Sequence, residues 1–308
     1  MRVGLDVGGT KTDAVVVDAR DRVLASVRLA TLWGPVGVVE TVADAVAALG
    51  AMPGIDAAQF SSVGIGMPGQ VRPGSGRVTH ALNLGVADLD VAAAVAPRLG
   101  LPVHVENDVK AAALGAAALD RPGASLAFLN LGTGVAAGIV LGGRLWRGAG
   151  GSAGEVGHIS IDPAGPLCRC GGRGCIEALA GGAAIADRWG RPAALPVRDV
   201  FDAADAGDAL ATVIRRDLAR AVAAAVRILV LTADVERVVI GGGLTALADR
   251  MVPEVRVELE RSAAASPFLR SLRLPDRMQV LPTGSPVAAV GAAIGGGTTI
   301  EQEVSARG

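Results

Sequence analysis

The chain carries one pattern twice: an apolar run, a short glycine-containing turn, and two more apolar runs. Residues 2–7 lead into the turn 8–10, and residues 14–17 and 23–29 follow. In the second half, residues 126–131 lead into the turn 132–134, and residues 136–141 and 144–146 follow. Apolar runs bounded by such turns predict β-strands. A repeated unit of this size predicts two similar lobes.

Helical patterns cover residues 36–49, 91–99, 109–119, 208–231 and 286–294, and further strands are expected at 62–65, 103–105 and 235–240. We therefore expect an α/β fold with two lobes that face a cleft, where ligands usually bind. Residues 1–119 plus 287–308 would form a small lobe, and 120–286 a large one. One continuous doubly wound sheet is the alternative.

Charge and hydropathy exclude several classes of protein. Lys and Arg total 29 and Asp and Glu total 30, so no basic field would attract nucleic acid. The N-terminus reads as a strand, without the features of a signal peptide, and no stretch approaches the ~20 apolar residues of a membrane span. We expect a cytoplasmic protein with no nucleic-acid or membrane partner.

Both glycine turns are candidate phosphate-binding loops. Glycine leaves backbone N–H groups accessible to an anion, and hydroxyl and ammonium groups stand beside them. A plain hairpin turn would explain one such loop, but the second copy favours phosphate. Asp6 could hold Mg²⁺, which prefers one or two carboxylates together with phosphate oxygens. The candidates are Asp6, Gly8, Gly9, Thr10, Lys11, Gly132, Thr133 and Gly134.

Two further glycine turns follow apolar strands. The turn at 241–243 would let a flat ligand such as adenine approach Gly242 and Gly243, although a tight strand-to-helix turn reads the same way. The loop at 66–69, ending in Gly69, is either a wall for a small ligand or a simple connection.

Polar residues 106–108 stand between an apolar strand and a helix. Asp108 could accept the proton of an attacking hydroxyl, because phosphoryl transfer needs positioning, charge neutralisation and a nearby carboxylate. The competing interpretation is helix capping, which Asn and Asp both favour.

Three cysteines and one histidine form the most specific cluster: His158, Cys168, Cys170 and Cys175. One imidazole and three thiolates match a closed, structural Zn²⁺ site. Free thiols or a redox pair are the alternatives. Glu155 and Glu177 flank the ligands, so the metal could fix two carboxylates that bind sugar hydroxyls; exposed surface glutamates are the plainer interpretation.

Taken in order, six motifs resemble the ROK family of bacterial sugar kinases and repressors, and they span nearly the whole chain. They are DVGGTK at 6–11, GMPG at 66–69, END at 106–108, GTG at 132–134, GEVGH at 154–158 and CRCGGRGCIE at 168–177. The last two are the most specific.

The resemblance implies an actin-like ATPase fold (ribonuclease H-like) whose two lobes close on ATP and a hexose. It assigns Asp108 as the catalytic base. It makes Asn107, Glu155, His158 and Glu177 sugar contacts, His158 and the three cysteines zinc ligands, and the glycine–threonine turns neighbours of the phosphates. It also suggests a dimer or tetramer.

Two departures matter. Family glucokinases often carry a Trp shortly after an Asn-Leu pair, whereas Asn83-Leu84 is followed here by Gly85-Val86, which leaves the outer wall of the sugar pocket open. The repressors carry an N-terminal helix-turn-helix, whereas this sequence starts at the phosphate loop, so we expect the kinase branch.

The sequence therefore predicts an ATP-dependent hexose kinase, with the 6-hydroxyl of glucose as acceptor and Mg²⁺ beside the phosphates. Alternatives are a kinase for N-acetylmannosamine, N-acetylglucosamine or another hexose, a non-catalytic sugar sensor, and a chaperone-like ATPase, which would not explain the zinc cluster. The phosphate donor, ATP or polyphosphate, stays open.

Overall fold

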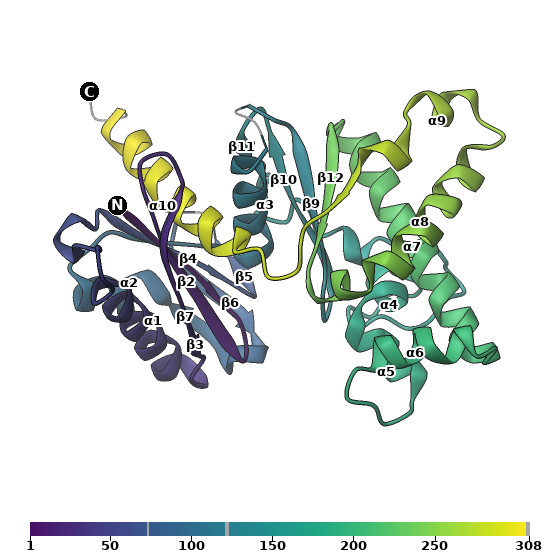
Figure 1. Cartoon of the computed structure of the whole chain (residues 1–308), viewed down its shortest axis with the longest axis horizontal. Helices are drawn as coiled ribbons and strands as arrows, with labels where there is room; N and C mark the ends of the chain where they lie inside the picture. Colours follow the sequence, from purple (N-terminus) through teal and green to yellow (C-terminus); the bar gives the residue numbers. More distant parts are fainter. Residues whose placement is uncertain (73, 121–122, 306–308) are drawn as a thin grey trace. The chain divides into compact units, whose positions relative to one another are not determined.

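The computed structural model describes residues 1–72, 74–120 and 123–305. Within the predicted lobes, residues 73, 121–122 and 306–308 lie outside this part. The described chain contains two five-stranded sheets, one three-stranded sheet, and helices on the faces of the sheets (Figure 1).

The two large sheets have the same strand order. The first runs β3 (Val23–Ala30), β2 (Lys11–Val17), β1 (Arg2–Val7), β4 (Ser62–Met67), β8 (Val103–Asn107). The second runs β11 (Arg144–Leu145), β10 (Val135–Leu141), β9 (Leu126–Leu131), β12 (Arg237–Gly241), β13 (Met278–Val280). In each, a central strand is followed in sequence by its neighbour on one side, and later strands add parallel on the other side. The duplication read from the sequence is present, and the single continuous sheet is wrong.

Alternation along β1 explains how both faces of the first sheet are covered. Val3, Leu5 and Val7 pack into a core with helix α1 (Gly34–Gly50). On the opposite face, helix α10 (Val287–Ser305) lies so close to β1 and β4 that a Cβ on Gly4 or Gly64 would stand within 2 Å of a helix carbonyl. Figure 1 shows α1 and α10 on opposite sides of these strands.

The remaining elements are shorter. The small sheet, which the sequence interpretation did not include, consists of β5 (Gln70–Val71), β6 (Arg77–Ala81) and β7 (Val86–Asp90). Its strands are brief and polar, so their alternation is weak. The α-helices are α2 (Val91–Leu99), α3 (Asp108–Ala118), α4 (Ile176–Ala180), α5 (Gly182–Trp189), α6 (Pro196–Asp205), α7 (Ala209–Ala233), α8 (Ala248–Ala263) and α9 (Pro267–Ser271). Short 3₁₀ turns are η1 (Ala57–Gln59), η2 (Leu82–Leu84), η3 (Val156–His158), η4 (Gly243–Leu247) and η5 (Leu274–Arg277).

Contacts within the chain define two compact units. The first comprises residues 1–124, 138–153 and 286–308, and the second 125–137 and 154–285. The division falls inside β10, between Ala137 and Gly138.

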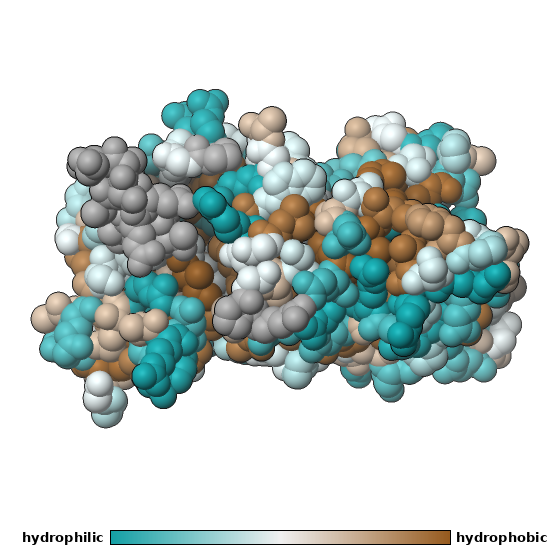
Figure 2. Space-filling view, turned by 90° about the horizontal axis from the view of Figure 1, so that it is seen from above, coloured by the Kyte–Doolittle hydropathy of each residue, from teal (hydrophilic) through white to brown (hydrophobic). Residues whose placement is uncertain are grey.

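On the face that Figure 2 presents, hydrophilic residues are interspersed with hydrophobic ones. None of the described helices combines the length and the hydrophobicity that a membrane crossing requires.

Candidate functional site

The carboxyl ends of three parallel strands bring candidate residues of the first unit to one sheet edge. In the register of β1, β4 and β8, Asp6 pairs with Gly66, and Gly66 pairs with Glu106. Helix α3 begins directly after β8, at Asp108. Ligands of open α/β sheets bind at the carboxyl ends of the strands. This sheet edge is therefore a candidate ligand-binding site.

Capping at the start of α3 is done by Asn107. Its side-chain oxygen accepts hydrogen bonds from the backbone N–H groups of Val109, at 3.1 Å, and Lys110, at 3.2 Å. Its amide nitrogen donates to the carbonyl of Gly69 at 3.2 Å, which ties the 66–69 loop to this helix. Asp108 is the first helical residue, where the helix dipole favours negative charge. The capping interpretation therefore applies to Asn107, which accepts both N–H groups, and one carboxylate oxygen of Asp108 also accepts the N–H of Val109, at 2.9 Å.

An ion pair between Glu106 and Arg147, which the sequence analysis did not predict, supports this segment. Glu106 accepts the backbone N–H of Asn107 with one carboxylate oxygen, at 2.9 Å, and binds Nε of Arg147 with the other, at 2.8 Å. Only 15% of the Glu106 side chain is exposed, so the pair is partly shielded from water. It holds the strand end that carries Asn107 and Asp108. Arg147 lies 41 positions away in the chain, and no local pattern marks it.

Asp6 lies in a cluster of carboxylates. Burial, and then the negative charges of Asp108 and Asp13, raise the pKa of Asp6 to about 7, which Lys11 opposes. Asp13 is paired with Arg28, and the buried carboxylate of Asp6 beside Asp108 fits a cation such as Mg²⁺, whose preferred ligands are oxygens. Asp6 is the residue that would hold this ion.

Each of the two glycine–threonine turns is closed by one backbone hydrogen bond, which spans three residues in the first turn and two in the second. In the first, the N–H of Gly8 donates to the carbonyl of Lys11 at 2.9 Å, and in the second the N–H of Gly132 donates to the carbonyl of Gly134 at 3.1 Å. Among the described residues, the next two N–H groups of each turn have no hydrogen-bond partner: Gly9 and Thr10, and Thr133 and Gly134. Thr10, Lys11 and Thr133 are exposed. Both turns thus offer free backbone donors to an anion.

Hydrogen bonds from the start of α5 and to the side chain of Glu177 stabilise the second turn. Gly182 and Ala183, at the start of α5, donate their N–H groups to the carbonyls of Gly132 and Thr133, at 2.9 and 3.0 Å. A carboxylate oxygen of Glu177 accepts the N–H of Val135 at 3.0 Å, and a Cβ on Gly134 would be 2.4 Å from it. In this structure Glu177 supports the turn.

The glycines after β12 differ in their surroundings. Gly242 has a φ of +91°, and a Cβ there would be 2.5 Å from the carbonyl oxygen of Leu131. Gly243 is exposed, and a Cβ there would meet nothing within 4 Å. The backbone at Gly243 is therefore open to a flat ligand.

The sequence GEVGH forms a tight turn against the start of β10. Gly154 has a φ of +93°, and a Cβ on it would be 1.8 Å from the carbonyl oxygen of Ala137. A Cβ on Gly157 would be 1.9 Å from the carbonyl oxygen of Val135. The turn continues as η3 and ends at His158, with Glu155 at its start. Both glycines are needed for this close approach, which fixes the backbone that carries Glu155 and His158.

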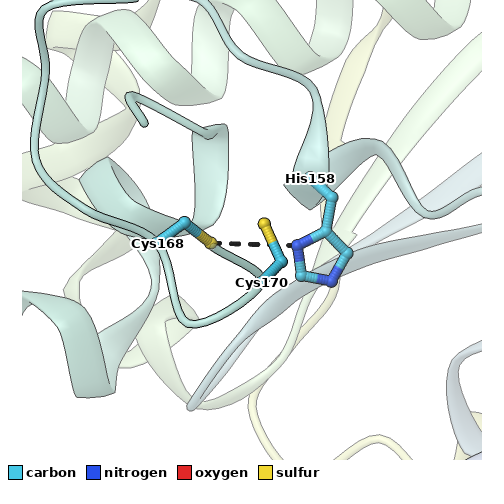
Figure 3. A group of neighbouring side chains, drawn as sticks. All are labelled: His158, Cys168 and Cys170. Carbon is cyan, nitrogen blue, oxygen red and sulfur yellow. Dashed lines mark hydrogen bonds between the residues drawn. The ribbon is translucent and has the colours of Figure 1, made fainter. Parts of the chain in front are cut away.

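The side chains of His158, Cys168 and Cys170 gather at one point (Figure 3), where their ligand atoms all lie within 4.8 Å of one another. Nδ1 of His158 is 3.9 Å from Sγ of Cys168, and Sγ of Cys170 is 3.8 Å from Sγ of Cys175. Two sulfurs bound to one tetrahedral zinc at 2.3 Å lie about 3.8 Å apart. The three gathered residues and the spacing of Cys170 and Cys175 fit Zn²⁺, but Cys175 is not among the residues whose ligand atoms all lie within 4.8 Å of one another.

Residues 168–175 form a tight loop, here called the knuckle. Backbone hydrogen bonds within the loop hold its conformation. Cys168 donates its N–H to the carbonyl of Gly172, at 2.8 Å, and Gly171 donates to the carbonyl of Cys168, at 2.9 Å. An N–H of Gly172 lowers the pKa of the Cys170 thiol to about 7, whereas burial raises the pKa of Cys175 to about 12. A zinc ion would need Cys175 as thiolate, so binding would release its proton.

Comparison with known proteins agrees with these features. The ROK family profile matches residues 2–297. This chain belongs to the ROK family. Among curated ROK relatives, the glucokinase of Streptomyces coelicolor is 32% identical over 283 residues, which cover 85% of this chain and 87% of that protein. The N-acetylmannosamine kinase of Escherichia coli is 33% identical over 266 residues, 85% of this chain and 89% of that one.

Solved ROK structures share the fold. The ROK hexokinase of Thermus thermophilus aligns with a TM-score of 0.81 and 31% identity, over 98% of this chain and 99% of that one. A ROK glucokinase from Streptomyces griseus, in complex with glucose and AMPPNP, aligns with a TM-score of 0.77 and 30% identity, over 96% and 99%. The resemblance and the two-lobed actin-like ATPase fold expected from it are confirmed.

Within this ROK chain, the predicted residues fall into two groups. The first unit holds Asp6, Gly8, Gly9, Thr10, Lys11, Gly69, Asn107 and Asp108. The second holds Gly132, Thr133, Gly134, Glu155, His158, Cys168, Cys170, Cys175, Glu177, Gly242 and Gly243. Each group is assembled from segments that are distant in sequence.

Proposed function

We propose that this protein, a sugar kinase of the ROK family, transfers the γ-phosphoryl group of ATP to the 6-hydroxyl of glucose. The observation that carries the proposal is the geometry at the start of α3, where Asn107 caps two N–H groups and Asp108 follows it as the first helical residue, at the carboxyl ends of the parallel strands. Support also comes from the two glycine–threonine turns with free N–H donors and from relatives named as glucokinases.

In the proposed reaction, Asp108 accepts the proton of the attacking hydroxyl as the oxygen forms its bond to the γ-phosphorus, and ADP leaves. Gly69, Asn107, Glu155, His158 and Glu177 would contact the sugar. The N–H groups of both turns, with Thr10, Lys11 and Thr133, would hold the phosphates, and Gly242 and Gly243 would face adenine. When bound beside Asp6, Mg²⁺ neutralises charge on the phosphate oxygens.

We assign His158, Cys168, Cys170 and Cys175 to a structural Zn²⁺ with a closed ligand set. Their positions support that role, because the ligands belong to a turn and a knuckle whose backbones pair with one another. Ile176 donates its N–H to the carbonyl of Ile159 at 3.1 Å, so the metal would fix the segment leading into Glu177. Cytoplasmic location and assembly into a dimer or tetramer belong to the same proposal.

An N-acetylhexosamine is the second candidate acceptor, and the similarity to N-acetylmannosamine kinase favours it at 33% identity. The deciding experiment is coupled ADP release from ATP over a panel of glucose, mannose, N-acetylmannosamine and N-acetylglucosamine, repeated with polyphosphate as donor. We expect glucose to give the highest kcat/KM. Faster turnover of an N-acetylhexosamine would replace glucose as acceptor, and no turnover on any sugar would refute the proposal.

A further inference from the structure

Trp33 is a large aromatic side chain that the chain leaves in contact with solvent. It lies between β3 and α1, and 70% of its surface is exposed. No hydrogen bond of its indole N–H is found within the described part of the chain. Single exposed apolar side chains are ordinary on protein surfaces, so it is the surroundings of Trp33, and not its exposure alone, that point to a ligand.

The backbone around Trp33 is fixed to the first glycine turn. Thr31 donates its N–H to the carbonyl of Thr10 at 3.2 Å, and its hydroxyl lies 2.9 Å from that of Thr12. Leu32 donates its N–H to the hydroxyl of Thr41 at 3.0 Å. The residues immediately before Trp33 are therefore anchored both to the phosphate turn and to α1.

The indole itself rests on Gly85, which has a φ of +68°. A Cβ at Gly85 would stand 2.5 Å from Cε2 and 2.6 Å from Nε1 of Trp33, so the position of the ring depends on glycine there. One face of the indole is thus supported, while most of the side chain stays exposed.

Gly85 closes the turn η2, which touches both parts of the proposed site. A Cβ on Gly9 would be 2.8 Å from the carbonyl oxygen of Asn83, in the middle of η2. A Cβ on Gly69 would be 3.1 Å from the backbone nitrogen of Ala81, just before η2. Gly69 in turn accepts the hydrogen bond of Asn107. The turn that supports Trp33 lies between the phosphate loop and the start of the catalytic helix.

We propose that Trp33, seated on Gly85, is a specificity-determining residue that covers the apolar C–H face of the acceptor sugar. The acceptor hydroxyl must approach both the Asp108 carboxylate and the γ-phosphate at the first turn, and η2 adjoins the loops of both. Adenine is placed by the proposed function at the glycines after β12, in the second unit. The inference rests on that function and identifies a wall of the acceptor site.

The test compares Trp33→Ala and Trp33→Phe with wild type. Trp33→Ala should raise the KM for glucose about tenfold, the value expected for losing one aromatic face, while kcat and the KM for ATP stay within about twofold. Trp33→Phe should recover most of the loss, because phenylalanine keeps an aromatic face. Phe268→Ala, which removes an exposed aromatic side chain (62%) on α9 in the second unit, should change neither constant.

Binding measured without turnover separates this inference from the proposed function. Calorimetric titration with glucose should show the same weakening in Trp33→Ala. Wild-type turnover with an unchanged glucose KM and affinity in Trp33→Ala would overturn the role of Trp33 alone, as would a rise confined to the KM for ATP. A wild type that neither binds nor phosphorylates any sugar of the panel would overturn both proposals.

Discussion

Asn107 makes the cap of α3, and Asp108 is the proposed base; the sequence alone left capping open for both residues. Both side chains accept the N–H of Val109, Asn107 at 3.1 Å and Asp108 at 2.9 Å, but Asn107 also accepts the N–H of Lys110, at 3.2 Å. The carboxylate of Asp108 can therefore be changed without removing the cap.

Asp108→Asn should reduce kcat by 10²–10⁴, the usual contribution of a general base, with the sugar affinity and the thermal midpoint little changed. Steady-state kinetics and thermal unfolding measure the two effects. The matched control is Asp90→Asn, at a helix N-cap where the side chain accepts from Ala93 at 2.9 Å, and it should leave kcat intact. Near-normal turnover in Asp108→Asn would remove Asp108 as the base.

Asp6 makes stability depend on pH, because its folded-state pKa is about 7 against an ordinary value of 3.8. Between about pH 4 and 7 the unfolded chain has lost this proton while the folded protein keeps it, so stability falls as pH rises through that window. Above pH 7 Asp6 is ionised in the folded protein too, and the whole loss of stability is present.

Asp6→Asn should therefore be more stable than wild type above pH 7 and equally stable near pH 4. A pKa shift of three units corresponds to about 4 kcal/mol of free energy of unfolding. Because Asp6 is partly exposed, we expect the variant to gain about 2 kcal/mol above pH 7. Urea unfolding at pH 4, 5.5 and 8 measures it, with Asp44→Asn as an exposed control. A difference between variant and wild type that does not change with pH would show that Asp6 carries no such strain.

Among the elements, the knuckle between η3 and α4 joins the proposed metal to two functional segments. It follows the turn that carries Glu155 and precedes the helix that carries Glu177, whose carboxylate supports the second phosphate turn. Loss of the ion should therefore reach the phosphate turn through α4.

Cys170→Ser should lower bound zinc from one equivalent to less than half, reduce the thermal midpoint by several degrees and lower kcat/KM. Elemental analysis, thermal unfolding and kinetics follow the three effects. Arg169→Ala, a neighbouring change that breaks only an exposed ion pair with Asp187, should keep the metal. Purified wild type without zinc, but with full activity in the presence of chelator, would contradict the assignment.

Helix α10 depends on glycines in the strands beneath it. A Cβ on Gly64 would stand 1.8 Å from the carbonyl oxygen of Ala292, so Gly64→Ala must displace the helix backbone. We expect a loss of about 3 kcal/mol in the free energy of unfolding, measured with urea. Gly150→Ala, where a Cβ meets nothing within 4 Å, should change stability little. Equal stability of both variants would mean that α10 does not pack as described.

Gly85 is the position where this chain departs from the family pattern, and its role is seen only in the packing of η2. The missing side chain makes room for Trp33, which comes from a segment 52 positions earlier (85 minus 33). Local sequence could not reveal the pair, because contact between the two residues depends on how η2 packs against the segment before α1.

For the whole molecule, both units contribute residues to the proposed kinase. A ligand that binds only the folded chain stabilises it by mass action, about 2.7 kcal/mol at one hundred times its dissociation constant. Glucose at that concentration should raise the thermal midpoint, whereas a hexose that is not turned over should not. Stabilisation by every hexose alike would argue against specific binding.

The predicted lobe boundaries, at 119/120 and 286/287, stay a prediction. Most strands and helices of the two large sheets were expected from periodicity, because long apolar runs reflect burial that local sequence records. The brief strands of the small sheet and helices α5, α6 and α9 lack such runs, and they depend on packing.

The sequence by itself determined the duplicated α/β pattern, the two glycine–threonine turns and the residue types of the proposed metal site, because each is a short-range arrangement of residue types. Tertiary structure decided the tasks of individual side chains. Glu177 reaches a backbone group 42 positions away, and Glu106 an arginine 41 positions away. Strand register brings Asp6 beside Gly66 and Gly66 beside Glu106. Such contacts arise only when the whole sheet and its helices pack, so no local pattern encodes them.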